Sequence, residues 1–361
     1  MDLGTQNILF LTRTMKLGGT ENVILQLCEI FKPIVNNIVV CSCGGVNVEK
    51  LNELGIKHYL IPDIQGKTPL NMMWTLQNVR SIVKKENITV IHSHHRMAAL
   101  YANLVSGKKI TLITNSHNIF HDKKQLTRIA YKRNNLIAVG EHVKKNLVEF
   151  FGIQNGNVTV IHNAVKPFMG EVVPVPEIVK AKEKGKTIIG NIGRLSEQKG
   201  MEYFIKAAKE ILEMRHDVCF FIIGDGEDAD KLKKMAQTLL LGDSLVFLGY
   251  RPDVQNVMSQ MDFIVLSSLW EGLPLTPIEA FSVRKSVIAT AVDGTPEVVT
   301  DGKNGLLVEP KDVKQLIDAI IKMCQDTEMR QKCADVAYQT YAEEFSFETL
   351  SRRYVNYYKE L

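Results

Sequence analysis

The sequence predicts an α/β protein built from two doubly wound parallel-sheet domains. Its 361 residues equal two to two and a half domains of about 150 residues. Short apolar strands alternate with helical segments along the whole chain, which is typical of parallel sheets covered on both faces. Both halves also open alike, with an apolar strand, a glycine-bearing turn and an amphipathic helix. Two similar α/β domains therefore follow from length, alternation and repetition.

The composition excludes several other classes of protein. Apolar residues make up 45% and charged residues 23% of the chain, which is ordinary for a globular protein. The sequence contains no run of about 18 apolar residues, the minimum for a membrane span. The opening MDLGTQNILFLTR lacks the basic lead, apolar stretch and cleavage site of a signal peptide. The six cysteines form no CxxC pair, so we expect buried thiols in a cytoplasmic protein.

The domain boundaries follow from the order of the elements. We expect strands in the first domain, residues 1–165, at 7–13, 36–43, 88–94, 110–117, 136–140 and 158–163. In the second domain, residues 187–345, we expect strands at 186–195, 218–224, 245–250, 263–268, 287–290 and 305–309. Between them, residues 166–186 contain three prolines and little periodicity, which indicates a linker. In open parallel sheets ligands bind beyond the carboxyl ends of the strands, so the strand-to-helix loops should carry the function.

The opening of the second domain shows how its first helix is recognised. In GRLSEQKGMEYFIKAAKEIL, Ser196 is a candidate N-cap. One helical face then carries Tyr203, Phe204, Ala207, Ala208, Ile211 and Leu212. This is a strand–turn–helix unit.

Charge is divided unevenly between the halves. Residues 1–165 contain 19 Lys and Arg against 10 Asp and Glu, a net +9, whereas the remainder is −5. The stretch 108–145 is the most basic, and Lys124, Arg128 and Lys132 recur every four residues along a predicted helix. With Lys123 and Arg133 they form a candidate docking face for an anionic membrane or a phosphate-bearing acceptor; a solvated helix face is the alternative. No aromatic-interleaved module for nucleic acid is visible.

The most informative stretch is SSLWEGLPLTPIEAFSVRKSVIATAVDGTPEVVTDGKNGLLVEP, residues 267–310. An apolar strand ends in two serines, and a helix is expected to begin near Thr276 and Pro277, with proline in its first position. Free N–H groups at a helix start bind phosphate. Glu279, placed in the first turn, can accept the hydroxyls of a ribose, and Glu271 can accept the hydroxyls of a sugar.

Together with GRLSEQKG, FIIGDGED, VFLGYRPDV and LTRTMKLGGTENVI, this stretch resembles family 4 of the retaining glycosyltransferases, which have the GT-B fold. The resemblance covers nearly the whole chain in the family's order. It implies two Rossmann-like domains facing across a cleft, with the acceptor on the first and the donor on the second. It also implies that a C-terminal helix at 346–361 packs back on the first domain.

The resemblance implies a role for each site residue. Arg194 and Lys199 are similar to the basic pair that binds the donor diphosphate, and Glu271 and His117 to the contacts of the transferred sugar. The remaining donor-binding residues implied are Gly18 and Gly19 near the phosphates, Tyr250, Arg251 and Val254 around the nucleobase, and Leu275, Thr276 and Glu279 at the helix start and ribose. The chain departs from the family at Asn163-Ala164, where Asn-Gly is usual, which affects only a local turn.

Other side-chain clusters give weaker signals. His92, His94 and His95 share a short segment, but no Cys, Asp or Glu ligand follows nearby. Asp228 and Asp230 have the spacing of a metal-binding DxD motif, yet acidic residues in a first helical turn already have a reason in the helix dipole. We therefore expect no metal and no cofactor. A nicotinamide oxidoreductase is disfavoured because neither glycine turn gives GxGxxG.

The resulting expectation is a retaining transferase of a hexose or N-acetylhexosamine. The donor would be a nucleotide diphosphate sugar, with UDP favoured, and the acceptor a hydroxyl of a lipid-linked or cell-surface glycan precursor. The chain would work in the cytoplasm at the inner face of the membrane. The alternatives are an epimerase or hydrolase on the same fold, or a catalytically idle nucleotide-sugar binding subunit.

Overall fold

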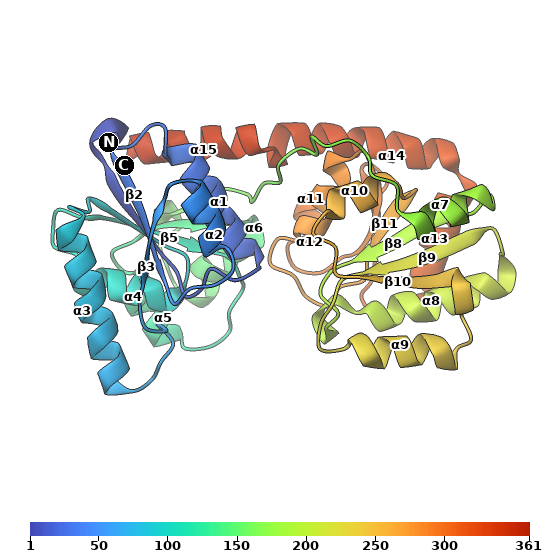
Figure 1. Cartoon of the computed structure of the whole chain (residues 1–361), viewed down its shortest axis with the longest axis horizontal. Coiled ribbons are helices and arrows are strands. Elements are labelled where there is room, and N and C mark those ends of the chain that lie inside the picture. The colour runs from blue at the N-terminus through green and yellow to red at the C-terminus, as the bar shows by residue number, and fades with distance from the viewer. The chain divides into compact units, whose positions relative to one another are not determined.

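The computed structural model describes all residues, 1–361, and divides them into two compact units (Figure 1). Unit 1 comprises residues 1–163 and 350–361, and unit 2 comprises residues 164–349. The chain therefore returns to unit 1 at its end. Each unit is a parallel sheet with helices on both faces, so the predicted α/β class with two doubly wound sheets is confirmed.

Unit 1 contains a seven-stranded parallel sheet in the order β3-β2-β1-β4-β5-β6-β7. Its strands are β1 (Asn7–Leu11), β2 (Asn37–Ser42), β3 (Lys57–Leu60), β4 (Val90–Ser93), β5 (Thr111–Ser116), β6 (Asn135–Ala138) and β7 (Val158–Val160). Its helices are α1 (Gly19–Phe31), α2 (Val48–Glu53), α3 (Pro69–Lys85), α4 (Arg96–Val105), α5 (Lys124–Tyr131), α6 (Glu141–Lys145) and most of α15 (Phe347–Glu360), with short helical turns at Leu3–Thr5, Asn146–Phe150 and Asn155–Asn157.

The two faces of this sheet are covered by different helices. On one face, Leu9 and Ile91 pack with Val79 of α3 and Ala98 and Tyr101 of α4. On the other face lie α1 and α15, whose Phe31 and Tyr358 rings are 4.3 Å apart. Strand β3 was not predicted, because it is an edge strand of four residues with no fully buried side chain and hence no apolar run.

Unit 2 contains a six-stranded parallel sheet in the order β10-β9-β8-β11-β12-β13. Its strands are β8 (Thr187–Ile192), β9 (Val218–Ile223), β10 (Leu245–Gly249), β11 (Phe263–Leu266), β12 (Val287–Thr290) and β13 (Gly305–Val308). Its helices are α7 (Pro176–Glu183), α8 (Met201–Met214), α9 (Ala229–Thr238), α10 (Val254–Ser259), α11 (Leu275–Ser282), α12 (Thr295–Val298), α13 (Val313–Gln325) and α14 (Thr327–Thr340), with short helical turns at Glu197–Lys199, Gly242–Ser244 and Tyr341–Phe345.

The segment 166–186, expected to be a linker, belongs to unit 2 and includes helix α7. Val175 and Ile178 are buried, and Gln260 accepts a hydrogen bond from the Val175 N–H at 2.9 Å. The segment is therefore packed. The structure contains no helix with both the length and the apolar character that a membrane crossing requires. All six cysteines are free thiols; five are buried, whereas Cys43 is partly exposed.

Candidate active site

A buried ion pair lies where strands β8 and β11 end in unit 2. These strands are neighbours in the sheet, so the loops that follow them meet at one edge. The Lys199 Nζ is 2.6 Å from the Glu271 Oε1, and the Ser268 hydroxyl donates to the same oxygen at 2.7 Å. The Glu271 side chain is 7% exposed and that of Lys199 is 16% exposed. Both bonds use Oε1, which leaves Oε2 of Glu271 for a ligand.

Glycines allow these loops to approach so closely. Gly200 has φ 56°, and a Cβ there would lie 2.2 Å from the Ser267 carbonyl oxygen, so no other residue fits without displacing backbone. The Ser267 hydroxyl donates to the Gly200 carbonyl at 3.0 Å. The Leu269 N–H donates to the Gln198 carbonyl at 2.7 Å. The GRLSEQKG loop and the SSLWEG loop therefore form one connected layer.

Arg194 contrasts with Lys199. Its side chain is exposed and makes no hydrogen bond or ion pair. The Lys199 stem lies over Gly193, where a Cβ would be 3.3 Å from Lys199 Cδ and Cε. Gly193 therefore contacts the stem of the paired Lys199, and the next residue along the chain is the unpaired Arg194. An exposed, unpaired cation on the loop that leads to Lys199 is available to an anionic ligand.

Helix α11 starts one residue earlier than predicted, which corrects two expectations. Its N-cap is Pro274 and its first residue is Leu275, so Pro277 is the third helical residue rather than the first. Glu279 is the fifth residue and lies in the second turn, and the first turn carries no acidic side chain. Thr276 is buried and Leu275 is half-buried. No side chain caps the start of α11.

Glu279 remains near the Lys199 pair despite this shift. Burial raises the pKa of its carboxyl, and the positive charge of Lys199 partly opposes that rise. A half-buried carboxylate close to Lys199 can accept hydroxyl donors of a bound ligand. Arg194, Lys199, Glu271 and Glu279 thus all lie on loops and helix starts at one edge of the unit 2 sheet.

The predicted nucleobase segment follows strand β10. Tyr250 is 58% exposed and offers an aromatic ring to solvent. Arg251 donates twice to Asp253, at 2.8 and 2.7 Å, which lowers the pKa of Asp253 to about 2. Val254 is the first residue of α10. The Arg251 guanidinium is therefore already engaged, whereas the Tyr250 ring is free.

In unit 1, His117 belongs to a cluster of three histidines at the ends of β4 and β5. Its Nε2 lies 3.2 Å from the Nδ1 of His94, and the His94 ring stacks on His92 at 4.5 Å. His92 lies between the Tyr358 hydroxyl at 2.7 Å and the Asn115 Oδ1 at 2.8 Å. Because Oδ1 only accepts, His92 carries its proton on Nε2 and accepts from the tyrosine through Nδ1.

Burial keeps this histidine cluster neutral. It lowers the pKa of His92 to about 3 and that of His117 to about 4, and it lowers the pKa of His94 well below its ordinary value. The structure contains no group of three His, Cys, Asp or Glu side chains arranged to hold a metal. Sequence reasoning missed Asn115, Tyr354 and Tyr358, because the two tyrosines lie more than 230 residues away from their partners.

Gly18 and Gly19 lie at the start of α1 in the same unit. Gly18 is the N-cap in extended backbone, and α1 begins at Gly19. A Cβ on Gly18 would lie 2.5 Å from Glu21 Oε2, and Glu21 accepts a hydrogen bond from the Thr14 hydroxyl at 2.7 Å. The glycine turn is therefore folded tightly against the first turn of the helix.

The remaining predicted motifs have local roles. Asp228 is the N-cap residue of α9 and Asp230 lies in its first turn, where the helix dipole favours acidic residues. Ser196 does not cap α8, contrary to the prediction; it precedes the short turn Glu197–Lys199, and Gly200 is the N-cap of α8. The predicted docking residues Lys123, Lys124, Arg128, Lys132 and Arg133 are all exposed on or beside α5.

Two family models match this chain. Residues 17–167 match the model described as Glycosyltransferase Family 4, and residues 177–340 match Glycosyl transferases group 1. The chain belongs to glycosyltransferase family 4. The predicted resemblance is therefore confirmed for both halves of the chain.

Known proteins support this assignment. The chain is 26% identical over 334 residues to the Escherichia coli UDP-Gal:alpha-D-GlcNAc-diphosphoundecaprenol alpha-1,3-galactosyltransferase, covering 86% of each. It is 25% identical over 254 residues to the Staphylococcus aureus poly(ribitol-phosphate) alpha-N-acetylglucosaminyltransferase, covering 67% of this chain and 48% of that protein. Among solved structures, a Rickettsia africae glycosyltransferase superposes with TM-score 0.87 at 22% identity, covering 98% of each chain. Anabaena HepE, solved with UDP and glucose, gives TM-score 0.82 at 21% identity, covering 99% and 100%. These structures confirm the GT-B fold.

Proposed function

We propose that this glycosyltransferase moves a hexose or N-acetylhexosamine from a UDP-sugar to a hydroxyl of a lipid-linked or cell-surface glycan precursor, with retention at the anomeric carbon and without a metal ion. The observation that carries the proposal is the Lys199–Glu271 pair at one edge of the unit 2 sheet, together with an exposed, unpaired Arg194 on the loop that leads to Lys199. Cations positioned near the charge that develops on the leaving group stabilise a departing diphosphate.

The chemistry follows from the charges. The bond between the anomeric carbon and the diphosphate oxygen breaks, and a bond to the acceptor oxygen forms on the same face of the sugar. The acceptor proton passes to the departing diphosphate, whose negative charge Arg194 and Lys199 stabilise. Glu271 is a poor nucleophile because Lys199 and Ser268 already occupy its Oε1. Its Oε2 instead accepts a sugar hydroxyl, and Glu279 accepts the ribose hydroxyls.

Unit 1 contributes a neutral histidine in this proposal. Burial lowers the pKa of His117 to about 4, so near pH 7 the ring can exchange hydrogen bonds with a hydroxyl of the transferred sugar without carrying charge. A neutral partner suits a transition state in which positive charge develops on the sugar. Gly18 and Gly19 would bring backbone near the donor phosphates.

The relatives support the proposed donor and acceptor. The Escherichia coli relative is named for UDP-Gal and a diphosphoundecaprenol acceptor, and the Staphylococcus aureus relative for N-acetylglucosaminyl transfer to poly(ribitol-phosphate). We extend the UDP-sugar donor and the lipid-linked acceptor to this chain, with a cytoplasmic location at an anionic membrane surface. The exposed basic side chains of α5, including Lys124 and Arg128, support that location because each near-surface cation contributes roughly 1 kcal/mol to binding anionic lipid.

A donor screen tests the proposal. UDP- and GDP-sugars are incubated with lipid-linked acceptors, and mass spectrometry follows both nucleotide release and the glycosylated product. We expect transfer from a UDP-sugar, an unchanged anomeric configuration by nuclear magnetic resonance, and full activity in a chelator. Nucleotide release without a product would indicate a hydrolase, and loss of activity with chelator followed by rescue with manganese would contradict the metal-free mechanism.

A further inference from the structure

The first two turns of α3 expose large apolar side chains. Leu70, Met73 and Trp74 are 53%, 47% and 52% exposed, and neighbouring Met72 is 40% exposed. The spacing i, i+3, i+4 places the first three on one face. The buried side chains of α3, Thr75, Val79 and Ile82, lie on the opposite face against the sheet. The apolar face therefore points away from the core and is about half exposed to solvent.

The same helix becomes basic toward its end. After Trp74 the exposed residues are Gln77, Asn78, Arg80, Ser81, Lys84 and Lys85. Helix α3 contains no acidic residue from Pro69 to Lys85. Its outer surface thus begins apolar and ends cationic, and long Lys and Arg side chains can reach away from an apolar layer to keep their charges in water.

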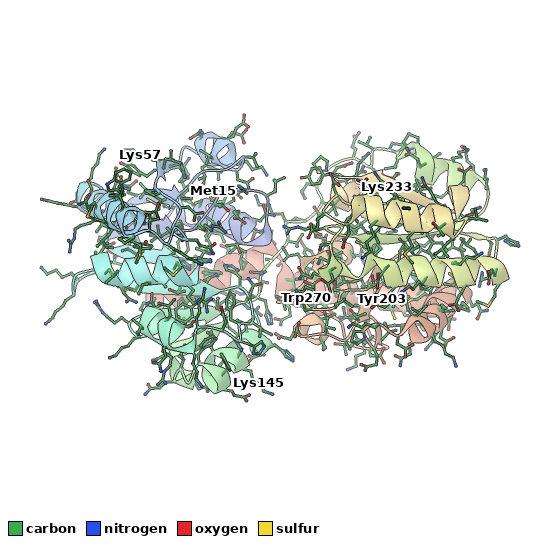
Figure 2. All side chains as sticks on the ribbon, turned by 90° about the horizontal axis from the view of Figure 1, so that it is seen from below. Met15, Lys57, Lys145, Tyr203, Lys233 and Trp270 are labelled. Carbon is green, nitrogen blue, oxygen red and sulfur yellow. The ribbon has the colours of Figure 1, made fainter.

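The helices beside α3 continue this surface. Helix α4 packs against both α3 and α5, and Figures 1 and 2 show the three in a row on one side of the sheet. Leu104 of α4 and Ile129 of α5 are 53% and 60% exposed. Nitrogen-tipped side chains project outward from this layer in Figure 2.

The charge of the layer is strongly one-sided. Residues 64–134 contain twelve Lys and Arg but only two acidic residues, a net charge of +10. Both acids are already paired: Glu86 contacts Lys57 and Tyr59, and Asp122 contacts Arg96 at 3.0 Å. Asp122 also lies 4.0 Å from Lys123, so the other ten cationic groups of this surface have no acidic partner within it.

We propose that Leu70, Met73 and Trp74 form an insertion surface that enters the headgroup boundary of an anionic bilayer while the basic side chains of α3 and α5 contact lipid headgroups. Exposed Trp and Leu side chains beside unpaired Lys and Arg are the composition of an interfacial membrane helix. A second copy of this chain is a poor occupant, because pairing the same face would bring +10 against +10. The inference rests on, and deepens, the membrane location proposed above.

Tryptophan fluorescence tests the insertion directly. The chain has two tryptophans, so Trp270→Phe leaves Trp74 as the single reporter. With phosphatidylcholine vesicles that contain phosphatidylglycerol, we expect a blue shift of Trp74 emission and quenching by brominated lipid. Leu70→Ser with Met73→Ser should weaken vesicle binding roughly tenfold or more through lost apolar burial. Met214→Ser is the matched control, because Met214 is 60% exposed in unit 2 and should leave binding unchanged.

The outcomes distinguish insertion into the bilayer from electrostatic docking and from self-association. If the protein sediments with anionic vesicles but Trp74 emission does not shift, docking is electrostatic only and the insertion is wrong. A shift that depends on protein concentration without lipid would indicate self-association through α3 and would also overturn it. Absence of vesicle binding would remove the membrane location as well, whereas UDP-sugar transfer to a soluble acceptor would still support the proposed chemistry.

Discussion

The Lys199–Glu271 site of unit 2 is charged, whereas the histidine cluster of unit 1 is neutral. The unit 2 site keeps full charges and stabilises them by pairing, with Lys199 and Ser268 on one carboxylate oxygen. The unit 1 cluster removes charge by burial, so that His92 and His117 stay neutral. Removing one member of the ion pair should therefore impair the unit 2 site, whereas the histidine cluster should be sensitive to changes in the residues packed around it and to pH.

The largest effect should come from the two cations of unit 2. Arg194→Ala and Lys199→Ala should each lower kcat by about a hundredfold or more, because each removes charge stabilisation that develops mainly in the transition state. Steady-state kinetics with the UDP-sugar donor measure this, and Lys233→Ala, an exposed lysine on α9, is the control. A change confined to KM would refute the leaving-group role.

The same two variants sharpen the comparison when their stability is measured. Lys199→Ala leaves the buried Glu271 without its ion-pair partner and should reduce the free energy of unfolding. Arg194→Ala removes an exposed, unpaired side chain and should change it by less than about 0.5 kcal/mol. Equal destabilisation by both variants would mean that Arg194 has a structural partner.

Glu279→Gln should weaken nucleotide binding by about tenfold or more, since hydrogen bonds to a charged acceptor contribute on the order of 1.5–3 kcal/mol. Folding should not suffer, because burial already disfavours the charged form of this carboxyl. Calorimetric titration with UDP measures the affinity. An unchanged affinity would mean that Glu279 does not contact the ribose.

In unit 1, Tyr358→Phe should lower the free energy of unfolding by roughly 1–3 kcal/mol, because the buried Nδ1 of His92 loses its only donor. Urea denaturation measures the loss. Tyr250→Phe, at an exposed ring in unit 2, is the matched control and should have little effect. Should the two variants prove equally stable, the hydroxyl of Tyr358 is not needed by His92.

The comparison also predicts a dependence of stability on pH. Below the ordinary histidine pKa of 6.5 the unfolded chain takes up protons that the buried rings refuse, since the folded pKa is about 4 for His117 and about 3 for His92. The free energy of unfolding should therefore fall as the pH drops from about 6.5 toward 4, by roughly 1.4 kcal/mol per pH unit for each such histidine. His92→Gln, which keeps a donor for Asn115, should flatten this slope.

The sequence predicted the features that are determined by short, local stretches of residues. The parallel sheets follow from apolar runs, and so does the position of Lys199 and Glu271 on loops that follow strands of the second domain; the ion pair between the two was not predicted. Strand β3 was missed because an edge strand with partly exposed residues has no apolar pattern. The start of α11 was misplaced by the expectation that Pro277 opens the helix, whereas Pro274 occupies the N-cap and the helix begins at Leu275.

The histidine cluster shows what a linear reading cannot supply. The three histidines of IHSHHR are a weak signal in the sequence. Their role depends on hydrogen bonds to Tyr358 and, through Asn115, to Tyr354, and both tyrosines lie at the other end of the chain. Nothing local to His92 specifies these partners. Only the packing of α15 on the unit 1 sheet shows that His92 is a core residue hydrogen-bonded to Tyr358 and Asn115.

The return of α15 to unit 1 has a consequence for synthesis on the ribosome. Residues 350–361 leave the exit tunnel after the whole of unit 2, so unit 1 waits with His92 and Asn115 uncovered while 186 residues of unit 2 are made. Unit 2 can complete its own sheet during that interval, because all six of its strands precede residue 309. Unit 1, although translated first, is therefore the last to be completed. A stop codon just before residue 350 would leave unit 2, which carries Lys199, intact and would damage unit 1.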